Sequence, residues 1–127
     1  MTRHLVTSAL PYANGPIHFG HIAGAYLPAD IYTRYLKMLH GESNVLYVCG
    51  TDEHGVAITI KAESENCDYQ SYVDKWHNEI KTLFEKFGIE FDIFSGTSRC
   101  KYHKATSQMF FTNLLDNGFV FKQSEKQ

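Results

Sequence analysis

"LPYANGPIHFGH", residues 10–21, joins two segments with different hydrophobic patterns, and this junction decides the fold. Before it, residues 4–9 (HLVTSA) form a short, apolar, β-branched run bounded by Pro11, which predicts a strand. After it, apolar residues recur at every fourth position over residues 19–40, which predicts a helix. Open α/β sheets bind ligands where a strand ends and the next helix begins, so residues 10–21 are the first candidate binding loop.

The predicted helix over residues 19–40 contains one irregularity. Its apolar face consists of Ala23, Leu27, Ile31, Tyr35 and Leu39. Pro28 lies within this pattern, and its ring would press on the carbonyl group of Gly24, so we expect a kink there. Gly41 follows the last turn and is expected to end the helix in the left-handed conformation.

Strands and helices alternate along the rest of the chain. Short apolar runs predict strands at residues 45–48, 91–95 and 119–121. Helical patterns predict helices at residues 56–64, 68–87 and 103–117. The run at 45–48 is continuously apolar, so we expect a central, fully covered strand. This alternation predicts an α/β fold, the first half of a Rossmann-like, doubly wound parallel sheet, truncated because no helix follows the last strand.

Composition narrows the class of protein. The 127 residues can form one small domain, and 12 Lys and Arg against 14 Asp and Glu leave no basic excess for nucleic acid. Three widely spaced cysteines favour neither a disulfide framework nor a zinc site in this chain. No signal peptide and no apolar stretch of about 18 residues is present, so we expect a cytoplasmic protein that does not enter a membrane.

His18, Gly20 and His21 form the first candidate site, at the start of the first helix. A helix N-terminus presents free N–H groups and partial positive charge, which favour a phosphate. Histidines three positions apart share a face of the helix, and each can donate hydrogen bonds to phosphate oxygens that gain charge in a transition state. Gly20 leaves room for a base or ribose against the backbone. Taken alone, the pair could also be ordinary polar residues or a chance metal pair.

"CGTDEHG", residues 49–55, forms the second candidate site, again directly after a predicted strand. Three ionisable residues between glycines suit the recognition of a small charged ligand, because the carboxyl ends of parallel strands meet at one edge of the sheet. Asp52 could pair with an ammonium group in a dry crevice. The alternative is that Asp52 or Glu53 only caps the following helix.

The first motif resembles the signature of the class I aminoacyl-tRNA synthetases, whose common form is His-Ile-Gly-His; here Phe19 takes the Ile position. Residues 11–21 are similar to both the methionyl and the isoleucyl enzymes, whereas "GTDEHG" resembles the methionyl branch. The resemblance implies that His18, Gly20 and His21 bind ATP and that the two histidines stabilise the transition state for adenylate formation.

The resemblance also assigns an amino-acid site. It implies that Asp52 holds the α-amino group of methionine, that His54 lies near the active site, and that Leu10 and Tyr12 line the methionine pocket. Apolar and aromatic walls suit a flexible thioether, and a tyrosine hydroxyl can orient the ligand. Val56 departs from the family, which often has Thr after the last glycine of the motif.

By resemblance, residues 1–127 are the N-terminal portion of the catalytic, nucleotide-binding domain and end near the start of the inserted connective domain. The complete enzyme would activate methionine with ATP and Mg²⁺ to methionyl-adenylate and transfer the methionyl group to tRNA(Met). Zinc would belong to the inserted domain, and the main tRNA contacts would lie outside this chain. We therefore expect the chain alone to be an inactive fragment.

Three alternatives stay open. An isoleucyl-type class I synthetase would share the first motif but not the second. An H-x-G-H nucleotidyltransferase of similar fold would adenylate a phosphate-bearing acceptor without needing an amino acid. A non-catalytic nucleotide-binding module would be expected if the reading frame ended at Gln127.

Overall fold

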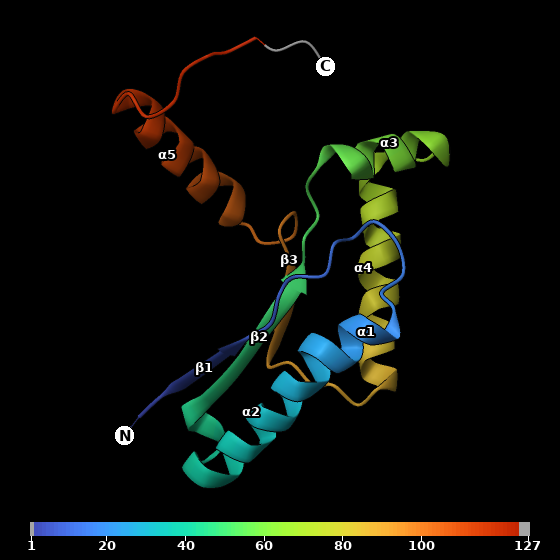
Figure 1. The fold of residues 1–127 in the computed structure, drawn as a ribbon, viewed down its shortest axis with the longest axis vertical. Helices are drawn as coiled ribbons and strands as arrows, with labels where there is room; N and C mark the ends of the chain where they lie inside the picture. The colour runs from blue at the N-terminus through green and yellow to red at the C-terminus, as the bar shows by residue number, and fades with distance from the viewer. Residues whose placement is uncertain (1, 125–127) are drawn as a thin grey trace.

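The computed structural model describes residues 2–124 and has an α/β fold built on a three-stranded parallel sheet (Figure 1). The strands are β1 (His4–Thr7), β2 (Val45–Thr51) and β3 (Ile93–Gly96), in the order β1-β2-β3. Residues Val6 and Tyr47 are register partners, as are Cys49 and Phe94. The predicted parallel sheet and the central position of the second strand are therefore confirmed.

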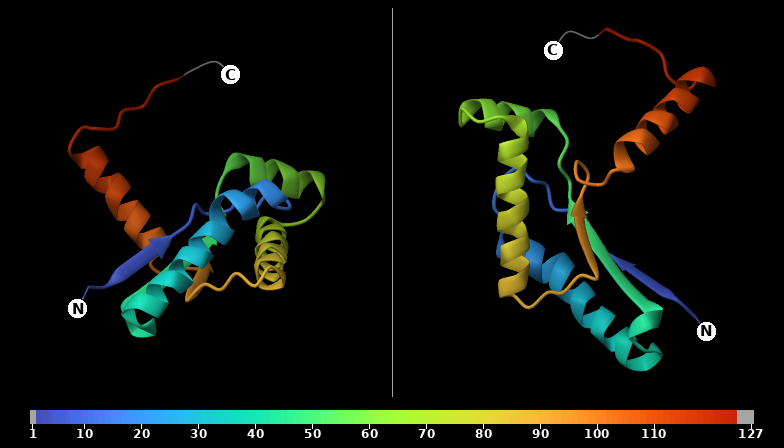
Figure 2. Two further views of the ribbon diagram at one scale, coloured as in Figure 1. Left: turned by 60° about the horizontal axis from the view of Figure 1, so that its bottom comes forward. Right: turned by 180° about the vertical axis from the view of Figure 1, so that it is seen from behind.

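Helices connect the strands and continue the chain after the last one. The elements between β1 and β2 are α1 (Phe19–His21), a π-helix η1 (Ile22–Tyr26), α2 (Leu27–His40) and a 3₁₀ turn η2 (Glu42–Asn44). Between β2 and β3 lie α3 (Val56–Ser64) and α4 (Tyr69–Lys86). The last helix, α5 (His103–Asp116), extends away from the sheet in every view (Figures 1 and 2).

The main core lies on one face of the sheet. Tyr47 and Cys49 of β2 point to this face and pack with Tyr26 of η1 and with Ile80 and Phe84 of α4. Both crossover connections therefore cover the same face, which supplies one of the two helical layers of a doubly wound sheet. The opposite face carries the exposed side chains of Leu5, Leu46 and Ile93. The expectation that β2 is covered on both faces was therefore wrong for the part of the chain described.

The helical region before β2 differs from its prediction in two ways. Pro28 has no N–H to donate to Gly24, and the chain forms the π segment directly before it, with Leu27 donating to Ile22 five residues back. The buried face was also predicted wrongly, since Ile31, Tyr35 and Leu39 are exposed. The face that packs against the core contains polar residues, so hydrophobic periodicity does not reveal it. Its buried residues are Ile22, Tyr26, Asp30, Thr33 and Leu36.

The polar side chains on that face can be buried because they have hydrogen-bond partners. Thr33 donates to the carbonyl oxygen of Ala29 at 2.8 Å, and the Asp30 carboxylate accepts bonds from Arg34 and from the Glu90 amide. Gly41 ends α2 with a φ of +85°, as expected, but its ψ of 146° is not that of the left-handed helical region.

The predicted strand at 119–121 is not formed. Residues Phe119 and Phe121 are 75% and 79% exposed, and no sheet edge lies beside them to pair with. An apolar run needs a neighbouring strand to satisfy its backbone groups, and in residues 2–124 this segment has none.

Candidate active site

Backbone hydrogen bonds join the two candidate loops. The Asp52 amide donates to the carbonyl oxygen of Pro11 at 2.8 Å, and the Ala13 amide donates to the carbonyl oxygen of Asp52 at 2.8 Å. Tyr12 and Asp52 thereby form a parallel bridge beyond the ends of β1 and β2. The structure thus brings together the segments that were expected to meet at the carboxyl edge of the sheet.

The adjacent carboxylates of Asp52 and Glu53 have opposite environments. Asp52 is half-buried, and no side chain or amide of residues 2–124 donates a hydrogen bond to its carboxylate. Glu53 is fully buried and accepts bonds from several donors. Neither residue caps α3, since its N-cap is Gly55 and no side chain bonds there. The capping alternative is therefore wrong, and Asp52 has a carboxylate available for a ligand.

His18 and His21 close a reciprocal capping box around the start of α1. The Gly20 amide donates to Nδ1 of His18 at 3.1 Å, and the His18 amide donates to Nδ1 of His21 at 3.2 Å. The two rings lie together, with centroids 3.8 Å apart. Because both Nδ1 atoms accept, the ring protons are on Nε2, so each exposed imidazole keeps one N–H donor for a ligand.

Gly20 makes this arrangement possible. A Cβ at Gly20 would lie 2.9 Å from Cε1 and 3.0 Å from Nδ1 of His18, which is closer than side-chain carbons pack. The absent side chain therefore leaves room for the His18 ring over its own backbone. This role of Gly20 differs from the predicted one. That Gly20 leaves space for a base or ribose stays a prediction.

A hollow of about 430 Å³ lies along the first loop and reaches the helix start. Leu10, Tyr12 and His21 all line it, together with Ala25 and Tyr26 from η1. Leu10 and Tyr12 are 49% and 37% exposed, so both have surface available for a ligand. The structure thus brings two predicted methionine-pocket residues and one predicted ATP residue to one hollow.

Tyr12 and His54 make further contacts around the second loop. The Tyr12 hydroxyl lies where a Cβ of Gly55 would be, so this position requires glycine, which also has a φ of +146°. His54 is exposed, with Nδ1 3.5 Å from the Tyr69 hydroxyl and its ring stacked 6.1 Å from that of His103. His54 therefore lies in the second loop but does not line the hollow.

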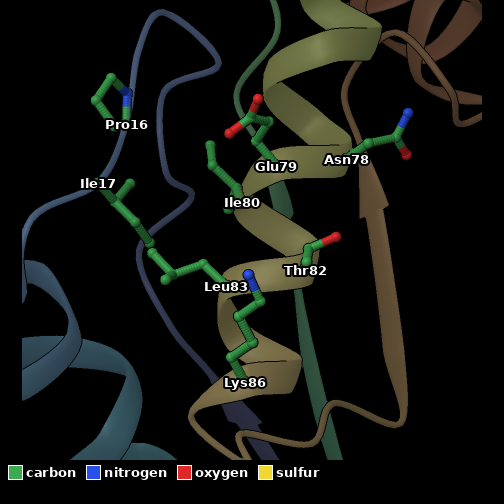
Figure 3. A pocket seen from close by; sticks show the side chains of 8 residues that line it. All are labelled: Pro16, Ile17, Asn78, Glu79, Ile80, Thr82, Leu83 and Lys86. Carbon is green, nitrogen blue, oxygen red and sulfur yellow. The ribbon is translucent and has the colours of Figure 1, made fainter.

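A second hollow, of about 510 Å³, lies between α4 and the segment that leads to α1 (Figure 3). Pro16, Ile17 and Leu83 form its apolar wall, and Glu79 and Lys86 lie at its rim. It contains none of the predicted site residues. Three of the predicted site residues, Leu10, Tyr12 and His21, line the other hollow instead.

Three other features were sought in the described residues: a nucleophilic cysteine, a metal site and a membrane-spanning helix. Burial raises the pKa of the Cys49 thiol to about 11, which keeps this core cysteine in the unreactive thiol form near neutral pH. Residues 2–124 contain no group of three or more His, Cys, Asp or Glu side chains that could hold a metal ion. Over the same span, no helix combines the length and the apolar character that a membrane crossing requires.

The sequence reasoning missed the residues that hold Glu53. Ser98 donates to its carboxylate through Oγ and through its amide, Arg99 donates through Nε, and Thr51 donates through its hydroxyl. Burial alone would raise the pKa of Glu53, but these hydrogen bonds outweigh it and hold the pKa below the ordinary value. Ser98 and Arg99 belong to no motif, so only the fold reveals them.

A parallel sheet, with an H-x-G-H helix start after its first strand and a free carboxylate after its second, defines a Rossmann-like α/β protein. The family described as tRNA synthetases class I (M) matches residues 4–127. The chain therefore belongs to the class I tRNA synthetases of this group.

Curated relatives and a solved structure agree with this assignment. The chain is 52% identical over 126 residues to a methionine–tRNA ligase of Chlamydia trachomatis, covering 99% of the chain and 22% of the relative. It is 54% identical over 127 residues to a methionine–tRNA ligase of Thermococcus kodakarensis, covering 17% of that protein. The chain thus spans about a fifth of the length of these relatives.

One solved structure that resembles the chain is the Mycobacterium tuberculosis methionyl-tRNA synthetase in complex with methionyl-adenylate. The TM-score is 0.78 at 25% identity, and the match covers 87% of this chain and 21% of that one. The Rossmann-like fold predicted from the alternation of strands and helices is therefore confirmed.

Proposed function

We propose that this chain is the first part of the catalytic domain of a methionine–tRNA ligase. The complete enzyme activates methionine with ATP to methionyl-adenylate and then transfers the methionyl group to tRNA(Met). One observation carries the proposal: Asp52, whose carboxylate is free, is held by backbone hydrogen bonds to the loop that leads into the H-x-G-H helix start. The names of the relatives and the adenylate bound by the mycobacterial enzyme support it.

Methionine would bind at the junction of the two loops. Asp52 would accept hydrogen bonds from the α-ammonium group, a charge-assisted interaction that strengthens as water is excluded. Leu10 and Tyr12 would contact the thioether side chain from the hollow that they line. His54, in the second loop, would lie beside the bound amino acid.

ATP would bind at the start of α1. The Nε2–H groups of His18 and His21 would donate to phosphate oxygens, and their bonds would strengthen as the carboxylate of methionine attacks the α-phosphate and pyrophosphate leaves. Their shared capping box holds both rings before the substrate arrives, so little reorganisation is needed. Gly20 would contribute backbone surface to the same site.

The remaining expectations belong to the same proposal. Mg²⁺ would arrive with ATP; because no carboxylate cluster in residues 2–124 fits it, we assign it no protein ligand here. Zinc, the main tRNA contacts and the inserted connective domain would lie beyond Gln127. A cytoplasmic location, where tRNA is charged, completes the proposal.

The test is ATP–pyrophosphate exchange by the product of the whole reading frame, with methionine, isoleucine or no amino acid. We expect methionine-dependent exchange that falls roughly 10²- to 10³-fold in His21→Ala. His40→Ala, which removes an exposed histidine at the far end of α2, is the matched control and should change little. Exchange with isoleucine, exchange without amino acid, or none would favour the isoleucyl enzyme, the nucleotidyltransferase or the non-catalytic module, respectively.

A further inference from the structure

We infer that Glu53 is a positioning residue for the amino-acid site: its buried carboxylate anchors the segment that follows β2, residues 52–54, so that Asp52 and His54 face the ligand. The inference rests on the proposed function. Successive side chains of extended backbone point to opposite sides, so a residue held inward turns both of its neighbours outward.

Donors from two segments converge on the Glu53 carboxylate. Thr51 Oγ1 and Arg99 Nε each donate to Oε1 at 2.7 Å, while the amide and the hydroxyl of Ser98 donate to Oε2 at 2.9 and 2.5 Å. Both oxygens are therefore doubly engaged. A neutral amide has one oxygen and one NH₂ group, so it cannot accept at both positions.

The Glu53 backbone is held as well. Its amide donates to Thr97 Oγ1 at 2.9 Å, and its carbonyl oxygen accepts from the Tyr69 hydroxyl of α4. The amide, the carbonyl group and the carboxylate are all fixed. Asp52, one residue earlier, is held by backbone hydrogen bonds to Pro11 and Ala13 of the first loop.

A hydrogen-bonded chain continues from Glu53 into α4. Because the Thr51 hydroxyl donates its proton to Glu53, its oxygen must accept from Nδ1 of His77, 2.7 Å away. Burial first, and then the charge of Arg99, hold the pKa of His77 below its usual value, although the Glu53 carboxylate, 3.3 Å from Nδ1, acts in the opposite direction. Arg99 bonds Asp74 of α4 at 2.7 Å as well, so the Glu53 carboxylate is linked to α4 both through Thr51 and through Arg99.

Gly96 leaves the space that the Glu53 carboxylate occupies. A Cβ at Gly96 would overlap the Glu53 carboxyl group, so the end of β3 must be glycine for Glu53 to turn inward. The Glu53 carboxylate therefore has space beside Gly96, donors at both oxygens and a direct backbone link to Asp52.

The test uses the whole reading frame and compares Glu53→Gln with Glu63→Gln, the same chemical change on the exposed surface of α3. We expect Glu53→Gln to raise the KM for methionine roughly tenfold or more while the KM for ATP changes less than about twofold, because charged hydrogen bonds beside Asp52 are lost. Glu63→Gln should match the wild type in both constants. A merely structural role would lower the active fraction and leave both KM values unchanged.

A second variant covers the case in which Glu53→Gln does not fold. Ser98→Ala removes one donor and keeps the carboxylate, and it should raise the methionine KM by a few-fold, again without an effect on ATP. An unchanged methionine KM in a folded Glu53→Gln protein, or in Ser98→Ala where Glu53→Gln does not fold, overturns the inference. Absence of methionine-dependent exchange in the wild type overturns the proposed function instead, so the two failures are distinguishable.

Discussion

The Asp52 amide donates a 2.8 Å hydrogen bond to the carbonyl oxygen of Pro11, which ties the two candidate loops together through their backbones. The return bond, from the Ala13 amide to the Asp52 carbonyl oxygen, closes the pair. Neither bond uses the Asp52 side chain. A substitution of that side chain should therefore change the chemistry of the site without moving the loop.

Asp52→Asn should weaken methionine binding and leave the fold intact. The loss of one charge-assisted hydrogen bond corresponds to about 1.5–3 kcal/mol, or a KM for methionine raised roughly 10- to 100-fold. Steady-state exchange kinetics at varied methionine would measure it, with urea denaturation to show unchanged stability. Asp116→Asn, at the exposed end of α5, is the control; an equal effect of both variants would remove the assignment of Asp52.

Gly20→Ala should lower activity by displacing the His18 ring. The new Cβ would lie 2.9 Å from that ring, which can swing away at small cost in stability but then loses its bond from the Gly20 amide. We expect kcat to fall roughly tenfold or more, because one preorganised donor is misplaced.

Gly24→Ala, on the same helical stretch, is the matched control, since a Cβ added at Gly24 would meet nothing within 4 Å. It should leave kcat unchanged and stabilise the helix by up to about 1 kcal/mol. Equal loss of activity in both variants would mean that any alanine in this stretch is harmful, and that the His18 contact is not the cause.

Local pattern was enough to predict the sheet and the candidate loops. The apolar runs before residues 10–21 and before residues 49–55 predict two strands, and parallel neighbours must bring their ends together. The pairing of Pro11 with Asp52 follows from that topology. The helix from Asp68 and its cap were also predictable, because the Asp68 carboxylate accepts from the Ser71 amide.

Other features depend on contacts between distant segments, which no local pattern contains. The buried face of α2 includes Asp30, whose partner Glu90 is 60 residues away, so hydrophobic periodicity selected the wrong face. Arg99 meets Glu53 across 46 residues and belongs to no motif. Residues 119–121 have the composition of a strand but lack a partner edge in the described chain.

Asp92 should contribute stability that is lost in acid. Burial alone would raise its pKa, but bonds from Lys37 at 2.8 Å and from the Tyr47 amide at 2.7 Å outweigh burial and hold the pKa below its ordinary value. A lowered folded-state pKa gives stability that is present above the unfolded pKa of about 4 and disappears as pH falls through the folded value.

Asp92→Asn should therefore lower the urea midpoint at pH 7 and flatten its decline below about pH 4. Urea denaturation of the whole protein from pH 7 to pH 3 would measure both effects. Glu90→Gln, whose side chain is 81% exposed, should keep the wild-type decline. A wild-type slope in Asp92→Asn would show that other carboxylates dominate acid unfolding.

Residues 1–127 alone should catalyse no exchange and should associate. Leu5, Leu46 and Ile93 leave one face of the sheet apolar and exposed, and such a face favours self-association. Static light scattering and exchange assays of this segment would test both points. Leu46→Thr, a β-branched polar residue on the uncovered face, should reduce scattering, whereas Tyr47→Thr, on the covered face, should increase it by opening the core. Measurable exchange by the isolated segment would contradict the expected inactivity, and monomeric behaviour would show that the exposed face needs no partner.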